Sequence, residues 1–361
     1  MKRVSSGKFD PAPVLSRWFA SHSRDLPWRK NRSLYRVWVS EVMLQQTQVI
    51  TASGYYKRFL NRFPSLTRLA AASLPEVLKI WEGLGYYARA RHLWLAAAVV
   101  RDEHGGRIPT SYDGFRKLPG VGEYTAAAVL SIASGQVLAA VDGNVLRVVC
   151  RWQGIGGDIR LPATKRSVRS FLETVIPEAT PGMFNETLME LGALVCLPKN
   201  PLCRQCPLRQ GCFAFSHGKT ALLPVKGRKK PVPTHHVALG VILRVGKMFI
   251  QQRPETGHLG GLWEFPGGKC RPGEKPELAV IRECREELGV GVNIAAKLAE
   301  VHHAYTHFKI ILHVFICRLS IGNPVTAQPH AWVKIEDLGN YPFPAANHKF
   351  FPILKEYLNE R

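Results

Sequence analysis

The sequence contains no apolar run of the ~20 residues that a membrane-spanning helix needs. The stretch from Met1 to Arg24 is basic, but it lacks the apolar centre of a secretory signal peptide. Internal repeats and low-complexity segments are also missing, so no repeat architecture is expected. These absences predict a soluble, cytoplasmic protein without a membrane partner, and 361 residues suit two or three domains.

Acidic side chains are scarce, with 27 Asp and Glu against 49 Lys and Arg, which gives a net charge of +22. Residues 1–218 carry 29 basic and 15 acidic side chains, residues 219–235 carry 5 and 0, and residues 236–361 carry 15 and 12. The concentration of positive charge before residue 236 predicts an anionic polymer as partner, held largely through counterion release. Residues 236–361 carry a much smaller excess of positive charge, so we expect them to bind a partner through a few specific contacts instead.

Of the eight cysteines in the chain, four are scattered. The other four form the pattern C-x6-C-x2-C-x5-C at Cys196, Cys203, Cys206 and Cys212. In a cytosolic protein such a cluster favours a metal over disulfides. Four thiolates at this spacing can hold either zinc or an iron–sulfur cluster, and the chemistry alone leaves both open.

The pattern of apolar residues changes once along the chain. From Asp10 to about His217, apolar residues recur at intervals of three and four, which predicts an all-α half, and one such helical run covers residues 36–60. Residues 219–235 hold three prolines and a basic run, so we expect an extended connector. Beyond it, β-branched strand candidates surround one helical stretch, which predicts a mixed α/β domain.

The segment LPGVG at residues 118–122 is the first motif that carries chemistry. Gly120 and Gly122 permit a tight turn whose backbone N–H groups can bind a phosphate at a helix N-terminus. A short helical stretch and the sequence AAVDGNV follow, in which Asp142 suits a helix N-cap and would lie near the held sugar. The combination resembles the helix-hairpin-helix DNA glycosylases, which pair this hairpin with an essential Asp.

The residue at position 124 indicates which branch of these glycosylases the chain resembles. Bifunctional relatives such as endonuclease III carry a nucleophilic lysine where this chain has Tyr124. No Schiff base can form there, so a monofunctional glycosylase that stops at an abasic site is expected, as in the adenine glycosylase (MutY) branch. The resemblance further implies that Asp142 stabilises an oxocarbenium ion, that Asn144 orients Asp142 or a water, and that Tyr124 lines the same pocket.

Glu41 lies in the helical stretch VWVSEVMLQQT, one turn from Trp38 on one side and Leu44 on the other. An apolar face would desolvate the carboxyl group and raise its pKa, as a general acid requires. From the pattern alone, a structural Glu paired with an arginine is the more common interpretation. The segment closely resembles the MutY helix whose Glu protonates adenine N7, so the resemblance implies that Glu41 is the acid.

Further roles follow from the resemblance alone. It implies a [4Fe-4S] cluster on the four clustered cysteines. Because the target base must leave the stack, Gln45 and Tyr86 are expected to enter the duplex, while Lys199 presents charge to a phosphate. Arg29 and Glu186 are expected to line the adenine pocket.

The last part of the chain contains GGKCRPGEKPELAVIRECREELGV, which matches the Nudix box except that Cys284 replaces an aliphatic residue. Glu283, Glu286 and Glu287 fall on one helix face, as Mg²⁺ ligands at a diphosphate would. Many MutY proteins carry a related domain with an eroded box, which they use to recognise 8-oxoguanine. The segment Tyr305-Thr306-His307 resembles the Phe-Ser-His loop that does so.

The resemblance covers nearly the whole chain and implies a multidomain fold. An all-α glycosylase, made of a six-helix barrel and an iron–sulfur helical domain, precedes an α/β Nudix-like domain. The expected boundaries are residues 30–138 for the barrel, 1–29 with 139–218 for the iron–sulfur domain, 219–235 for the connector and 236–361 for the Nudix-like domain.

The implied activity is excision of adenine mispaired with 8-oxoguanine or guanine, by a monomer acting on double-stranded DNA in a bacterial nucleoid. Two alternatives stay open. A Nudix hydrolase of free nucleoside triphosphates, alone or as a second activity with Mg²⁺, would explain the intact box but leave Glu41 and Asp142 without a purpose. A non-catalytic iron–sulfur DNA sensor would explain only the charge and the cysteines.

Overall fold

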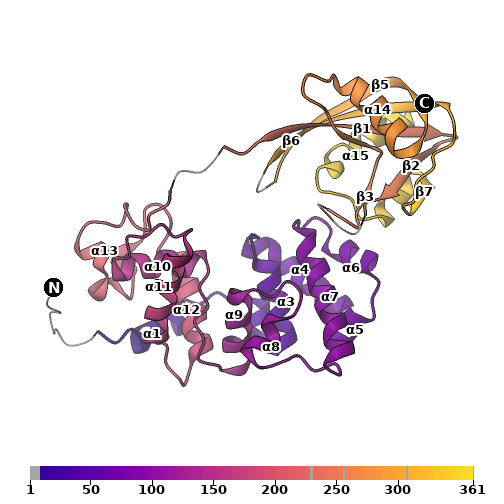
Figure 1. Ribbon diagram of the computed structural model, residues 1–361. Helices are drawn as coiled ribbons and strands as arrows, with labels where there is room; N and C mark the ends of the chain where they lie inside the picture. Colours follow the sequence, from indigo (N-terminus) through magenta and orange to yellow (C-terminus); the bar gives the residue numbers. More distant parts are fainter. Residues whose placement is uncertain (1–8, 228–230, 255–256, 258, 306–307, 361) are drawn as a thin grey trace. The chain divides into compact units, whose positions relative to one another are not determined.

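The computed structural model describes residues 9–227, 231–254, 257, 259–305 and 308–360 (Figure 1). Contacts divide the chain into two units, Met1–Ala70 with Leu95–Lys229 and Ala71–Trp94 with Lys230–Arg361. Residues 71–94, which the sequence places in the helical barrel, therefore group with the C-terminal residues, and the domain boundaries remain a prediction. Among the described residues, no helix is long and apolar enough to cross a membrane.

Helices fill the chain as far as Ser216, which confirms the predicted all-α part (Figure 1). They are α1 (Pro11–His22), α2 (Pro27–Lys30), α3 (Leu34–Leu44), α4 (Val49–Arg62), α5 (Leu66–Ala70), α6 (Leu74–Trp81), α7 (Tyr87–Glu103), α8 (Tyr112–Arg116), α9 (Glu123–Ser134), α10 (Gly143–Gln153), α11 (Pro162–Glu173), α12 (Pro181–Leu194) and α13 (Phe213–Ser216), with 3-10 turns at Cys203–Gln205 and Arg209–Gly211.

The single helical run expected over residues 36–60 is wrong, because α3 and α4 are separate helices. Gln46 adopts a left-handed backbone with φ 57°, which ends α3. Gln48 has an extended backbone and is the N-cap of α4. The break leaves Gln45 and Gln46 at the end of the helix that carries Glu41.

The predicted hairpin turn lies between α8 and α9. Gly120 has φ 75°, and the Val121 amide donates to the Leu118 carbonyl at 3.1 Å. Gly122 is the N-cap of α9 and provides no side-chain acceptor for the first turn. At the start of α10, Asp142 Oδ1 accepts from the Val145 amide at 2.7 Å, which confirms Asp142 as an N-cap.

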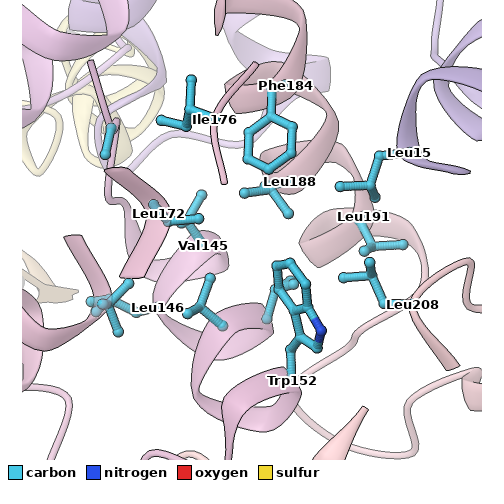
Figure 2. Packing of buried hydrophobic residues seen from close by; sticks show 14 of the residues in the cluster. Leu15, Val145, Leu146, Trp152, Leu172, Ile176, Phe184, Leu188, Leu191 and Leu208 are labelled. Carbon is cyan, nitrogen blue, oxygen red and sulfur yellow. The ribbon is translucent and has the colours of Figure 1, made fainter. Parts of the chain in front are cut away.

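The core of the first unit fixes α10 against α12. Val145 and Trp152 of α10 face Leu188 and Leu191 of α12, and Leu15 of α1 closes the cluster (Figure 2). All five side chains are buried. Apolar residues on α10 and α12 thus hold in place the two helices that carry Asp142 and Glu186.

The C-terminal part is α/β, as predicted, and is built on a seven-stranded sheet with the path β3-β2-β1-β6-β5, while β4 pairs with β1 and β7 pairs with β2 (Figure 1). β1 and β6 run parallel, and the other pairs are antiparallel. The elements are β1 (Thr234–Arg244), β2 (Lys247–Gln252), β3 (Trp263–Glu264), β4 (Gly267–Lys269), α14 (Pro276–Leu288), β5 (Gly291–Ala304), β6 (Lys309–Ile321), β7 (His330–Val333) and α15 (Phe351–Asn359), with 3-10 turns at Ile335–Asn340 and Asn347–Lys349.

Apolar side chains alternate between the two faces of this sheet. Ala238 and Ile242 of β1 pack in one cluster with Cys284 of α14, whereas Leu239 packs in another with Leu354 of α15. The period of two along β1 explains why one helix covers each face. Cys284, the departure from the Nudix pattern, is fully buried and takes the place of an aliphatic core residue.

Candidate active site

A cleft of about 940 Å³ lies in the first unit and brings together most of the residues singled out in the helical half of the sequence. Its walls come from α2, α3, the hairpin, α10 and α12. The predicted site residues that line it are Arg29, Glu41, Gln45, Gly120, Gly122, Tyr124, Asp142, Asn144 and Glu186.

Glu41 is 5% exposed, so the burial expected from its helical pattern is confirmed. Burial raises the pKa of Glu41 to about 7, and the charges of Asp142 and Glu186 add to the rise. The Tyr124 hydroxyl donates to Glu41 Oε2 at 2.6 Å and opposes that rise by stabilising the carboxylate. A carboxyl group with this pKa can both carry and release a proton near neutral pH.

Asp142 holds its carboxylate with local donors. Besides the amide of Val145, Asn144 Nδ2 donates to Asp142 Oδ2 at 3.0 Å. Burial raises the pKa of Asp142 above its usual value, and the two donors oppose the rise. Both oxygens are therefore fixed in direction beside the N-terminus of α10, where the helix dipole favours a negative charge.

Arg147 connects Asp142 to the cysteine loop and was missed by the sequence analysis. Its Nη2 donates to Asn144 Oδ1 at 2.8 Å and to the Gly192 carbonyl at 2.6 Å, and its Nε donates to the Cys196 carbonyl at 2.6 Å. Asn144 is thus held between Arg147 and Asp142. The sequence around Arg147 does not indicate which residues it binds, because its partners Gly192 and Cys196 lie 45 and 49 residues further along the chain.

The four clustered cysteines are free and line one small pocket. Arg151 Nη1 lies 3.4 Å from Cys196 Sγ, and Arg151 also donates to the carbonyls of Leu197 and Pro198. Within the described part of the chain, no group of three or more His, Cys, Asp or Glu side chains is arranged to hold a metal ion. The donor set, which consists of four thiols with no carboxylate or imidazole on the pocket wall, suits either a thiolate-held iron–sulfur cluster or a zinc ion.

Charged side chains from α2 and α12 also line the cleft. Arg29 Nε donates to Glu186 Oε1 at 3.2 Å, so the two predicted pocket residues are in contact. Arg24, Arg32 and Glu190 complete this network and were not identified from the sequence. Their partners lie more than 150 residues away along the chain, beyond the reach of any local pattern.

The residues expected to contact DNA differ in their surroundings. Gln45 is half-buried and donates to Thr125 Oγ1 at 3.2 Å, whereas the next residue, Gln46, is exposed. Tyr86 has a left-handed backbone with φ 51° after Gly85, and its side chain is 41% exposed. Lys199 is exposed in the loop between the first two cysteines.

The α/β domain has a separate pocket of about 510 Å³, lined by Glu264, Glu283, Glu287, Tyr305 and Asn347 among others. Burial raises the pKa of Glu264 to about 7 and also raises the pKa of Glu287. Of the loop expected to read 8-oxoguanine, Tyr305 is described, while Thr306 and His307 lie outside the described residues.

The Nudix glutamates do not all face this pocket. Glu286 is half-exposed and pairs with Arg271 at 3.0 Å and with Arg282 at 3.0 Å. Arg282 also binds Glu283 at 2.7 Å and Glu274 at 2.8 Å. Arginine therefore neutralises part of the acidic face that the sequence assigns to Mg²⁺.

Two family models match the chain. Residues 39–178 match the HhH-GPD superfamily of base excision DNA repair proteins, and residues 238–352 match the NUDIX domain. The first match spans the cleft from Glu41 to Asp142, and the second covers most of the sheet domain.

Curated proteins similar to the chain include the adenine DNA glycosylases of Mus musculus and Buchnera aphidicola subsp. Schizaphis graminum. The mouse protein is 35% identical over 95% of this chain and 77% of its own length, and the Buchnera protein is 30% identical over 95% and 98%. Among solved structures, a thermostable thymine-DNA glycosylase matches with a TM-score of 0.53 and 30% identity, over 57% of this chain and 95% of its own.

Proposed function

Because this chain belongs to the adenine DNA glycosylase family, we propose that it removes adenine mispaired with 8-oxoguanine or guanine in double-stranded DNA. Membership of the family makes the chain an N-glycosylase of base excision repair. The observation that carries the proposal is the cleft, which is lined both by the buried Glu41 with its raised pKa and by Asp142, the N-cap of α10.

In this proposal Glu41 donates its proton to N7 of the adenine that has left the base stack. The bond between C1′ and N9 then breaks, and the electron pair stays with the departing base. The Asp142 carboxylate stabilises the positive charge of the sugar until a water attacks C1′ and gives up a proton, which restores the acid form of Glu41. The products are free adenine and an abasic site.

The strand is left intact in this scheme. Tyr124 occupies the position where bifunctional relatives carry a lysine, and its hydroxyl is already donated to Glu41. Burial raises the pKa of Tyr124 well above its usual value, so the phenol keeps its proton. The reaction therefore has no amine nucleophile at this position to form a Schiff base.

DNA binding is proposed to use the hairpin and its surroundings. Gly120 and Gly122 bring backbone N–H groups to a phosphate at the N-terminus of α9, and Lys199 adds charge from the cysteine loop. Tyr86 and Gln45 fill the space that the extruded base leaves. The exposed, left-handed Gln46 is a further candidate for this role.

We assign the four cysteines to one [4Fe-4S] cluster. The cluster would tie the loop of residues 196–212 to α10 through Arg151 and order the exposed Lys199. The four thiols that line one pocket support a thiolate-held metal, and the resemblance of their spacing to that of the MutY family favours the iron–sulfur cluster over zinc.

The α/β domain is proposed to recognise 8-oxoguanine through Tyr305, Thr306 and His307. A second candidate is Mg²⁺-dependent hydrolysis of a nucleoside triphosphate, which the pocket carrying Glu283 and Glu287 favours. The ion pairs of Arg282 with Glu283 and Glu286 support the first role, because they compete with a metal.

The test is a panel of duplexes carrying adenine opposite 8-oxoguanine, guanine, cytosine or thymine. We expect release of free adenine from the first two, with strand scission only after alkali. No release from any duplex would contradict the proposed function. Release of pyrophosphate from a free triphosphate with Mg²⁺, lost in Glu283→Gln, would support the second candidate.

A further inference from the structure

We propose that Glu190 is a positioning residue that sets the base specificity of the cleft by fixing Arg29 against Glu186. The inference rests on the proposed function, since it concerns residues that line the cleft in which adenine would bind. Glu190 and Glu186 lie one turn apart on α12, and the network that joins them lies entirely in the first unit.

Glu190 is a buried carboxylate whose oxygens are both occupied. Its side chain is 2% exposed. Oε1 accepts from the Arg24 amide at 2.9 Å and from Arg24 Nε at 2.8 Å, and Oε2 accepts from Arg24 Nη2 at 2.7 Å. The ion pair and these hydrogen bonds offset the cost of removing the Glu190 carboxylate from water.

Glu190 also fixes the direction of Arg29. Arg29 Nη2 donates to Glu190 Oε2 at 3.1 Å, and Arg29 Nη1 donates to the Arg24 carbonyl at 2.9 Å. The guanidinium group lies over the Phe19 ring at 4.9 Å. Because the guanidinium fork is planar and rigid, placing its two Nη groups places Nε as well, and Nε donates to Glu186 Oε1.

Glu186 is left with one oxygen for a ligand. Its Oε2 lies 2.9 Å from Arg32 Nη2, which is an ion-pair distance, but it accepts no aligned hydrogen bond from any described residue. A buried acceptor without a hydrogen bond is uncommon, and Glu186 lines the cleft, where a ligand can provide the donor.

The edge of the base that meets Glu186 would decide the selection. Adenine presents an exocyclic amine, which donates, whereas guanine presents a carbonyl oxygen at the same position. The amine of adenine can donate a hydrogen bond to Glu186 Oε2. The carbonyl oxygen of guanine would face Glu186 Oε2 as a second acceptor, without a proton between them. Glu190 therefore acts on specificity only through Arg29 and the orientation of Glu186.

The experiment compares single-turnover excision of adenine and of purine, the base without the amine, from otherwise identical duplexes. In Glu190→Gln the charge that holds Arg24 and Arg29 is gone. We expect adenine excision to fall ~10- to 100-fold, as for one lost hydrogen bond to a charged group. Purine excision should change far less, so the ratio of adenine to purine excision should fall by nearly the same factor as adenine excision.

Three further variants sharpen the result. Glu186→Ala should lower the same ratio, and Glu190→Gln should add nothing to it, because the two residues act in series. Arg24→Gln changes a partly exposed side chain, so it tests the network even if Glu190→Gln fails to fold, and it should lower the ratio less. Exposed Glu178 on the turn before α12 provides the matched control Glu178→Gln, which should leave the ratio unchanged.

Equal losses on adenine and purine in both Glu190→Gln and Arg24→Gln would overturn the inference, since a purely structural role slows both substrates alike. If the unsubstituted protein releases no adenine, the proposed function fails together with this inference. If it releases adenine and the variants keep its ratio, only the role of Glu190 is wrong.

Discussion

The Tyr124 hydroxyl donates a 2.6 Å hydrogen bond to Oε2 of Glu41, and so links the position that would carry the nucleophile of a bifunctional enzyme to the proposed acid. The bond stabilises the carboxylate and holds the pKa of Glu41 below the value that burial alone would give. In the proposed mechanism this bond tunes the acid, and Tyr124 offers no amine at the position where bifunctional relatives carry a lysine.

Tyr124→Phe should shift the pH dependence of excision upward. The reaction needs protonated Glu41, so the rate should fall as the pH rises through about 7 in the unsubstituted protein. Without the phenol the pKa of Glu41 rises further, and the falling limb should move to higher pH. Single-turnover rates from pH 5 to 9 measure the shift, with Tyr55→Phe, outside the cleft, as control. An unmoved limb would exclude Glu41 as the group that titrates.

Glu41→Gln should change the dependence of stability on pH. The pKa of Glu41 is about 7 in the folded chain and 4.5 as an ordinary carboxyl, so the folded state binds more protons between these values. The free energy of unfolding of the unsubstituted protein should then fall as the pH rises over this window. In Glu41→Gln the side chain does not titrate, so this contribution to the fall disappears.

The stability difference between Glu41→Gln and the unsubstituted protein should therefore grow in favour of the variant by on the order of 2–3 kcal/mol from pH 4 to pH 8. Urea unfolding at each pH measures it. A difference that stays constant with pH would mean that the pKa of Glu41 is not raised in the folded state.

Local patterns predicted much of the site. The hairpin and the cap at Asp142 depend on short stretches of sequence, and the burial of Glu41 follows from the period of its helix. The sheet was harder to predict from the sequence. Its strand β5 contains NIAAKLAEVHHA, in which small and charged residues obscure the apolar–polar alternation of a strand. The break after α3 was missed because glutamines, not glycine or proline, carry it.

The supporting contacts could not be predicted in the same way. Arg147 reaches Cys196 and Gly192, and Glu190 reaches Arg24 across 166 residues of sequence. Such pairs depend on how α1, α10 and α12 pack, which single-helix periodicity does not specify. The residues predicted from the sequence are therefore those proposed to act in the reaction. The residues that were not predicted support them through contacts between distant parts of the chain.

Gly192→Ala should disturb the Asp142 region through packing. A Cβ there would lie 2.6 Å from Asn144 Cβ and 3.1 Å from Asn144 Cα, so the first turn of α10 must move. We expect a loss of ~1–3 kcal/mol in stability and slower excision. Gly54→Ala on α4, with no atom within 4 Å, is the control. Unchanged excision in Gly192→Ala would show that Asn144 does not need its present position.

If the four cysteines hold the proposed [4Fe-4S] cluster, Cys203→Ser should lower the iron content below four atoms per chain and weaken the visible absorption of the cluster. Because Arg147 binds the Cys196 carbonyl, excision should slow as the loop loses order. Cys270→Ser, in the α/β domain, is the control and should keep its iron. Stoichiometric zinc in protein purified without air would contradict the cluster assignment.

The most direct test of the central claim is single-turnover release of adenine from a duplex with an adenine:8-oxoguanine pair, by the unsubstituted protein and by Asp142→Asn. Binding of the same duplex is measured in parallel. The account predicts that the substitution slows release by at least ~10²-fold, as for a lost electrostatic stabiliser, while binding is retained. Release by Asp142→Asn at nearly the unsubstituted rate would contradict the assignment of this cleft as the site of base excision.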